Sequence, residues 1–278
     1  MEYLMTYGWA ILIIAVVLGA LFQLGIFNAS TFSPKAPPGA CQVFRPNGPG
    51  TTSFINLEGV CNGELPQYVG VFNGQTSNIS FSQTSGFPQT TQKDISAFAW
   101  IRENPGAPSY PDIFAIGYGQ INTYSVSTNV YEPRMCTANG CWQDPSLQYS
   151  ANQWVMIGFT YNSTTHVAVS YMNGVAGTPQ SLATPNPQAT YAFIGGGSVY
   201  FFSGYLANIQ WYNVSLTANE VKALYNEGIG GAPVVLRSIQ GWWPLNGDAK
   251  DYSGNNNHGK VIRAVSFTSS WESSYSAP

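Results

Sequence analysis

Hydrophobic residues follow two distinct patterns along the chain. Residues 1–27 are almost continuously apolar: no charged residue follows Glu2 until Lys35, and Gln23 is the only strongly polar residue late in the run. About 25 helical residues span roughly 37 Å, enough to cross a bilayer. The pattern predicts one long apolar N-terminal α-helix over 1–27, either a membrane span or a filament core in which every face meets another helix.

The remainder of the chain has a β pattern. Residues 28–40 contain three prolines and no apolar periodicity, which predicts an extended linker. From Cys41 onward, short alternating or aromatic-rich runs are separated by Gly, Asn and Pro clusters, so residues 41–278 are predicted to form an all-β sandwich head. Strands are expected at 67–72, 95–102, 113–117, 124–131, 153–161, 166–172, 190–195, 204–212 and 239–245. One helix is expected at 215–226, with a capping box at Thr217 and Glu220.

Charge is scarce in this sequence. Only 8% of the 278 residues are charged, with a formal net charge of -3, against about 25% charged in ordinary soluble domains. Nucleic acid is therefore not an expected partner, because no basic field is available to hold phosphates. An aromatic content of 14% excludes a disordered chain. Asn, Gln, Ser, Thr, Gly and Tyr replace the charged residues, and we interpret this as a secreted, extracellular composition.

Glu2 stands directly before the apolar run, where an unpaired carboxylate in low dielectric costs several kcal/mol. A neighbouring subunit's N-terminal ammonium would neutralise it. Residues 2–13, EYLMTYGWAILI, resemble the start of archaeal type IV pilin-like subunits, which carry class III signal peptides. The resemblance implies cleavage before the apolar segment by a prepilin peptidase and assembly of the freed helices into a filament, with Glu2 as an assembly residue. In that family the glutamate lies a few residues after the cleavage site, whereas here Met1 directly precedes it.

The later runs resemble a second family. Taken in order, ISAFAWI (95–101), QWVMIGFTY (153–161), YMNGV (171–175) and GYLANIQWY (204–212) are similar to strands of the laminin-G-like or concanavalin-like jelly roll. The resemblance covers about 60–260 and implies that fold for the head. The motif GWWPLNGDAKDYSGNNNHG at 241–259 normally opens such a domain, whereas here it closes the chain. It can complete the same sandwich or begin a separate sheet edge.

The loop 248–259 concentrates oxygen-bearing side chains around Gly254. Hard oxygen ligands in a tight loop suit Ca²⁺, and in the jelly-roll family this loop often holds a structural calcium ion. Asp248, Asp251 and Asn255 are the candidate ligands. The alternative is a turn held by Asx hydrogen bonds without a metal.

Four cysteines in an exported head suggest disulfides, with three possible pairings. Cys136 and Cys141 bracket a hairpin-like turn, so bridging them would leave Cys41 to pair with Cys61. A zinc site is disfavoured, because the two histidines are far apart in sequence and no second clustered ligand pair is present.

Four N-x-Ser/Thr sequons predict an exposed head that carries N-linked glycans: Asn28, Asn78, Asn162 and Asn213. Each tripeptide can also arise by chance in a chain rich in Asn and Ser. For Asn213, a turn at the entry to the 215–226 helix is the alternative.

Catalytic residues are not apparent, so the protein is not expected to be an enzyme. Concanavalin-like glycosidases need paired carboxylates, whereas Glu103, Glu132 and Asp144 are isolated in the sequence. The run Gly195 to Gly197 is interpreted as a turn after a strand. Aromatic side chains could stack on sugar rings, and Trp142 is the aromatic expected to be most exposed.

Together these features predict a structural subunit of an extracellular type IV pilus-like filament. It would polymerise through its N-terminal helix and display a lectin-like head for adhesion or surface contact. Its expected partners are other copies of itself, the membrane before assembly, and glycans or other cell surfaces. The alternative is a membrane-anchored monomeric carbohydrate-binding protein.

Overall fold

A computed structural model describes residues 12–19, the backbone of strands 41–46 and 52–57, and residues 65–81, 94–116, 119–137, 140–182, 192–197 and 199–278. The chain forms two compact units, Met1–Gln42 with Asn56–Cys61, and Val43–Ile55 with Asn62–Pro278. Strands β1 (Cys41–Pro46) and β2 (Thr52–Leu57) pair with each other and contribute to both units.

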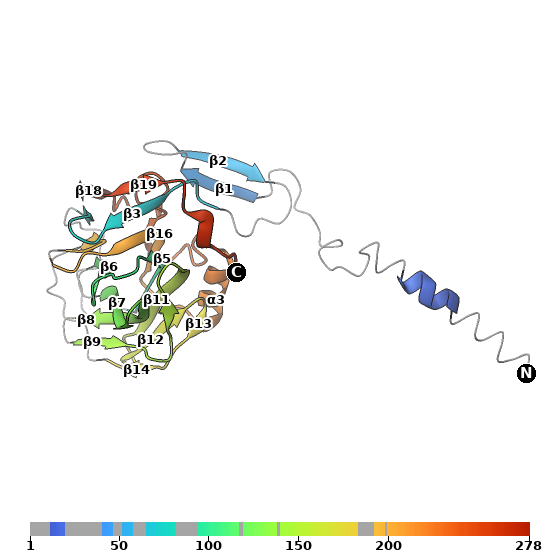
Figure 1. The fold of residues 1–278 in the computed structure, drawn as a ribbon, viewed down its shortest axis with the longest axis horizontal. Helices are drawn as coiled ribbons and strands as arrows, with labels where there is room; N and C mark the ends of the chain where they lie inside the picture. The colour runs from blue at the N-terminus through green and yellow to red at the C-terminus, as the bar shows by residue number, and fades with distance from the viewer. Residues whose placement is uncertain are drawn as a thin grey trace, which may run out of the picture. The chain divides into compact units, whose positions relative to one another are not determined.

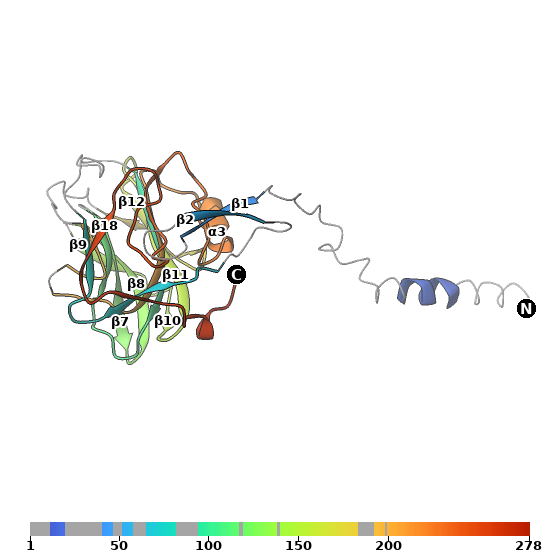
Figure 2. The same ribbon diagram turned by 90° about the horizontal axis from the view of Figure 1, so that it is seen from above.

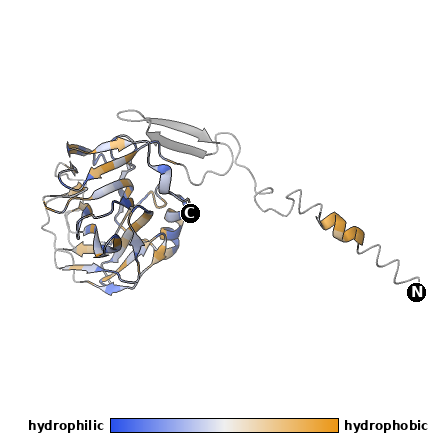
Figure 3. Cartoon of the chain, in the orientation of Figure 1, coloured by the Kyte–Doolittle hydropathy of each residue, from blue (hydrophilic) through white to orange (hydrophobic). Residues whose placement is uncertain are grey.

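Residues 12–19 are helical and lie inside the segment predicted as one long helix. Their apolar side chains are all exposed, from 48% for Leu18 to 64% for Val16, and the helix is hydrophobic on all sides (Figure 3). Among the described residues no helix is both long and apolar enough to cross a bilayer. The rest of the predicted helix and the 28–40 linker lie outside the described residues.

The head is a sandwich of two antiparallel sheets (Figures 1 and 2). We call the first the pocket sheet; its strand order is β10-β8-β7-β6-β15-β4-β18, with β9 paired to β8. Its strands are β4 (Asn78–Phe81), β6 (Asp112–Ile116), β7 (Gly119–Ser127), β8 (Val130–Thr137), β9 (Gly140–Gln143), β10 (Tyr149–Ser150), β15 (Ala192–Ile194) and β18 (Gly259–Arg263).

The second sheet, the back sheet, has the order β13-β12-β11-β5-β16-β3-β19, with β14 paired to β12 and β17 paired to β16. Its strands are β3 (Val69–Asn73), β5 (Ile95–Glu103), β11 (Trp154–Asn162), β12 (Val167–Met172), β13 (Val175–Ala176), β14 (Gln180–Ser181), β16 (Ser203–Tyr212), β17 (Ile239–Trp243) and β19 (Ser266–Thr268).

The main core lies between the sheets. Phe114 of the pocket sheet contacts Trp211 and Trp243 of the back sheet, with ring centroids 5.6 and 5.3 Å apart. Trp211 and Trp243 have no exposed surface, and burying side chains of this size provides a large share of the hydrophobic stabilisation of a sandwich.

A second cluster covers the outer face of the back sheet. Helix α3 (Ala218–Asn226) begins with the predicted capping box, in which Thr217 and Glu220 bond reciprocally, and packs against this face, on the side of the sandwich opposite β9 and β18 (Figure 2). The C-terminal segment packs there too: Trp271 is fully buried, and its carbonyl accepts a hydrogen bond of 3.1 Å from Trp154 Nε1. The short 3-10 helix Glu272–Ser274 follows.

The predicted strands coincide with observed ones except at 124–131, whereas the shorter strands β4, β9, β10, β13, β14, β18 and β19 and the pair β1 and β2 were not predicted. At 124–131 the structure replaces the single predicted strand with the end of β7, a turn, and the start of β8. The alternating pattern is continuous there, but Asn129 adopts a positive φ of 64° and reverses the chain, as Asn tolerates in tight turns. The C-terminal motif completes the same sandwich, because β17 pairs with β16, β18 with β4, and β19 with β3.

Candidate functional site

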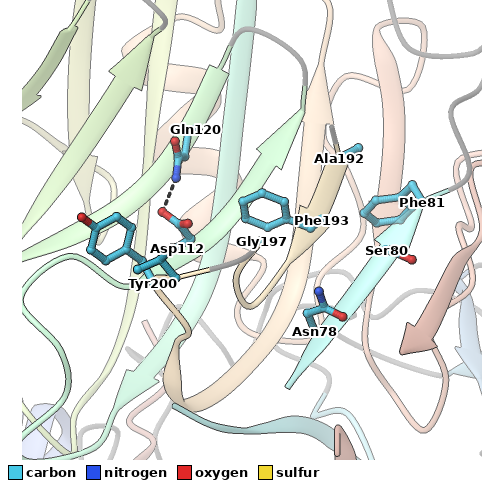
Figure 4. A pocket seen from close by; sticks show the side chains of 10 residues that line it. Asn78, Ser80, Phe81, Asp112, Gln120, Ala192, Phe193, Gly197 and Tyr200 are labelled. Atoms are coloured by element: carbon cyan, nitrogen blue, oxygen red, sulfur yellow. Dashed lines mark hydrogen bonds between the residues drawn. The ribbon is translucent and has the colours of Figure 1, made fainter. Parts of the chain in front are cut away.

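A pocket of about 640 Å³ opens on the outer face of the pocket sheet, within the roughly 300–1,000 Å³ range of small-molecule sites. Strands β4, β6, β7 and β15 and the loop that follows β15 form it (Figure 4). Its described lining residues are Asn78, Ser80, Phe81, Asp112, Gln120, Ala192, Phe193, Gly197, Val199 and Tyr200.

Strand pairing places polar and aromatic side chains on this face. Phe193 is opposite Ser80 on one side and Ala115 on the other, and Ala115 is opposite Gln120. Directly opposed residues point to the same face of a sheet. Figure 4 shows the Phe193 ring between Asp112 and Gln120 on one side and Asn78 and Ser80 on the other. The Phe193 ring therefore lies at the bottom of the pocket, with polar side chains on both sides of it.

Asp112 is the one carboxylate among the described lining residues. Its side chain accepts a short hydrogen bond from Gln120 Nε2 and a long one, 3.5 Å, from Asn122 Nδ2. Burial raises the pKa of Asp112 to about 6, opposed by these hydrogen bonds and by the charge of Arg134. The carboxylate is charged at neutral pH and available as a strong acceptor.

A tyrosine cluster adjoins the pocket. Tyr110 and Tyr124 stack with centroids 5.5 Å apart, and Tyr200, which lines the pocket, meets Tyr110 edge-on at 6.3 Å. Arg134 lies over the Tyr110 ring at 4.6 Å, a cation–π contact that orients the ring. Tyr110 and Tyr200 are 37% and 49% exposed, so the cluster offers aromatic surface to a ligand.

The sequence pattern did not identify Asp112, Gln120, Phe193 or the tyrosine cluster as a site. The prediction that Trp142 is the most exposed aromatic is wrong: on the edge strand β9 its side chain is partly buried, whereas Tyr110 and Tyr200 are exposed. One signal was present: Asp112 begins an otherwise apolar strand, DIFAI. The triglycine run is the predicted turn after β15, and it brings Gly197 to the pocket wall.

The predicted calcium residue Asp251 is saturated by hydrogen bonds. Its Oδ1 accepts from the backbone N–H groups of Trp242 and Ser253, both at 2.9 Å. Its Oδ2 accepts from the Ser253 hydroxyl at 2.9 Å and from the Asn257 N–H at 2.8 Å. This is the Asx-turn arrangement expected as the alternative to a metal.

The other two candidate calcium ligands are also engaged within the loop. Asp248 accepts from the Tyr252 hydroxyl at 2.9 Å. Asn255 directs its amide nitrogen to the carbonyls of Ile239 and Gln240. The described residues contain no cluster of three His, Cys, Asp or Glu side chains able to hold a metal. The donor set of this loop, as arranged here, does not fit Ca²⁺.

One disulfide links Cys136 and Cys141, directly opposite each other on β8 and β9. It lies beside the site, since Asn122 Nδ2 is 3.4 Å from Cys136 Sγ. Pairing of Cys41 with Cys61 lies outside the described side chains.

The sequons occupy different environments. Asn78 lies on β4 and lines the pocket, so a glycan attached there would enter it. Asn162 closes a turn by accepting from Thr164 and Thr165, and Asn213 is exposed next to β16. Asn28 and its surroundings, like Glu2, lie outside the described residues. Glycosylation of these positions stays a prediction.

Comparisons with known proteins agree with this fold. The sequence model of the Laminin_G_3 family, described as the concanavalin A-like lectin/glucanases superfamily, matches residues 73–222. No curated protein matches the chain. Among solved structures, a "putative carbohydrate binding protein" from Bacteroides ovatus ATCC 8483 is similar, with a TM-score of 0.59 and 16% identity over 79% of this chain. This chain spans 64% of that protein's length.

Two further structures have weaker similarity. The first is a heptameric SAP-like pentraxin from Limulus polyphemus, with a TM-score of 0.47 and 14% identity; the match covers 73% of this chain and 95% of the pentraxin chain. The second is domain 4 of the arabinanase AbnA from Geobacillus stearothermophilus, with a TM-score of 0.44 and 14% identity; the match covers 71% of this chain and 91% of that domain. The family match covers more than half of the chain, and the two-sheet sandwich is the fold it implies. The chain therefore belongs to the laminin-G-like family of the concanavalin A-like lectin/glucanase superfamily.

Proposed function

We propose that the head is a carbohydrate-binding domain that holds an oligosaccharide in the pocket of the pocket sheet. The observation that carries this proposal is the arrangement of Asp112 and Gln120 beside the Phe193 ring. A sugar ring presents an apolar face and a rim of hydroxyls. The aromatic ring accommodates the first, and the carboxylate and amide bind the second with directional hydrogen bonds.

We also propose that the head binds without catalysis. Glycosidases place two carboxyl groups about 5–9.5 Å apart around the scissile bond. Asp112 stands alone among the described lining residues. Glu132, on β8 of the same sheet, is buried and accepts a hydrogen bond of 2.9 Å from Gln148.

Binding can be tested by titration calorimetry with cellotetraose, maltotetraose and galactotetraose. The variants Asp112→Asn and Tyr200→Ala should each weaken binding of the sugar that binds best, by about tenfold for one good polar or aromatic contact. Leu236→Ala is the matched control, because Leu236 is 71% exposed and lies between α3 and β17. If pocket variants and control bind equally, the sugar binds elsewhere and the proposal is wrong.

The N-terminal segment supports a second proposal, that the chain is displayed outside the cell as a subunit of a type IV pilus-like filament. The exposed apolar side chains at 12–18 require lipid or other helices to cover them. Glu2 before the apolar run fits a contact with a neighbouring subunit's amino terminus. The membrane would hold the apolar N-terminal segment before assembly.

Replacing Glu2 with Ala tests the filament role. Electron microscopy of surface material should show filaments with the unaltered protein and none with the variant, while the head keeps its far-ultraviolet circular dichroism spectrum. Undiminished filaments would contradict the role of Glu2. If only single membrane-embedded copies appear for both proteins, the membrane-anchored carbohydrate-binding protein replaces the filament subunit.

A further inference from the structure

Positive charge gathers at one edge of the pocket sheet. In a chain with ten Lys and Arg residues, Lys260 and Arg263 both lie on the edge strand β18 and are both exposed. They are three residues apart, and a β-bulge between Val261 and Arg263 adds the extra residue that brings both to the same face of the strand.

Strand register brings these cations to the pocket. Lys260 is opposite Ser80, and Arg263 is opposite Asn78 across a β-bulge. Ser80 and Asn78 both line the pocket. Opposed residues on neighbouring strands share a face and have Cβ atoms about 4.5–5.5 Å apart, so the two long side chains start at the pocket's rim.

Among the described residues, neither Lys260 nor Arg263 forms an ion pair. The ion pair that the described residues make nearby is Lys250 with Asp248, at 4.0 Å. Asp112 lies on β6, three strands from β18, or about 14 Å at the usual strand spacing. Asp248, in the segment beside the start of β18, is paired with Lys250, so both exposed cations of β18 are available to an external anion.

We propose that the pocket selects an acidic sugar, with its carboxylate or sulfate bound directly by Lys260 and Arg263. This inference rests on the proposed carbohydrate-binding function and specifies its ligand class. The sugar ring lies against Phe193, with its hydroxyls toward Asp112 and Gln120, and the anionic group points to β18.

Matched pairs of probes test the charge alone. Trigalacturonic acid is compared with its methyl ester, and dextran sulfate with dextran, by titration calorimetry in 50 mM salt with EDTA present. The acidic member of at least one pair should bind about tenfold more tightly than the neutral member, the gain expected from two exposed charge contacts. Raising the salt to 500 mM should remove most of that gain. The pair that responds distinguishes a carboxylated from a sulfated ligand.

The double variant K260Q/R263Q should lose the tenfold preference and bind the neutral member as before. The control K222Q/R237Q removes the same charge from α3 and from the segment that follows it, and should keep the preference. Equal binding of acidic and neutral probes, or a preference that survives K260Q/R263Q, overturns this inference while leaving carbohydrate binding intact. Failure of every probe in these titrations, with the neutral tetrasaccharides failing too, overturns the proposed function itself.

Discussion

Glu103 is fully buried between the sheets, and its replacement by Gln should change the pH dependence of stability. Its carboxyl accepts hydrogen bonds from Tyr149 Oη at 2.8 Å and from Thr123 Oγ1 at 3.1 and 3.2 Å. Burial raises the pKa of Glu103 from 4.5 to about 8, and these two hydrogen bonds only partly oppose the rise. The group is therefore mostly neutral in the folded protein at pH 7.

The direction of the pH dependence follows from the linkage between proton binding and folding. In the unfolded chain Glu103 ionises at its ordinary pKa of 4.5, so the folded state binds one more proton between that pH and about 8. The stabilisation is complete below pH 4.5 and is lost as the pH rises toward 8. A pKa rise of this size corresponds to roughly 5 kcal/mol, the upper limit for the loss of unfolding free energy across this window.

Urea unfolding followed by tryptophan fluorescence at pH 4.5, 6 and 8 measures the effect. In Glu103→Gln the side chain stays neutral at every pH, so the part of the pH dependence that Glu103 causes should vanish. The exposed Glu272, in the short C-terminal 3-10 helix, provides the control Glu272→Gln, which should keep the unaltered protein's curve. Parallel curves for the Glu103→Gln variant and the unaltered protein would refute the reasoning.

Three further predictions concern binding and packing. Burial raises the pKa of Asp112 to about 6, so sugar affinity should fall as the pH drops from 7 to 5, and Asp112→Asn should remove that dependence in calorimetry. Trp271→Ala should lower the unfolding free energy by about 3–5 kcal/mol in urea titrations, because its side chain is fully buried against Trp154. Gly177→Ala should lower the melting temperature and cost about 1–3 kcal/mol, because the added Cβ would lie 1.9 Å from Asp144 Oδ2. A sugar affinity that does not change with pH would contradict the role of Asp112. An unchanged unfolding free energy for Trp271→Ala, or an unchanged melting temperature for Gly177→Ala, would contradict the packing described at that residue.

Local sequence signals predicted turns of the head correctly where the residue type determines the backbone conformation. Asn173 and Gly174 both adopt positive φ, 50° and 76°, in the turn between β12 and β13, as an Asn-Gly pair favours. The same logic failed at 124–131, because an alternating pattern continues through Asn129 and gives no sign of the reversal.

The pocket could not be predicted in the same way. Its walls come from strands that are far apart in the chain: Asn78 on β4, Asp112 on β6 and Phe193 on β15. Only the pairing of β15 with both β4 and β6 brings them together. In the 248–259 loop the sequence shows the oxygen-bearing side chains but not their partners: Asp251 accepts hydrogen bonds from backbone N–H groups of its own loop.

A crystal structure of the protein with the best-binding oligosaccharide tests the central claim most directly. The account predicts sugar density in the pocket, with a ring against Phe193 and a hydroxyl within hydrogen-bond distance of Asp112. Sugar bound at another surface, with the pocket empty, would contradict it.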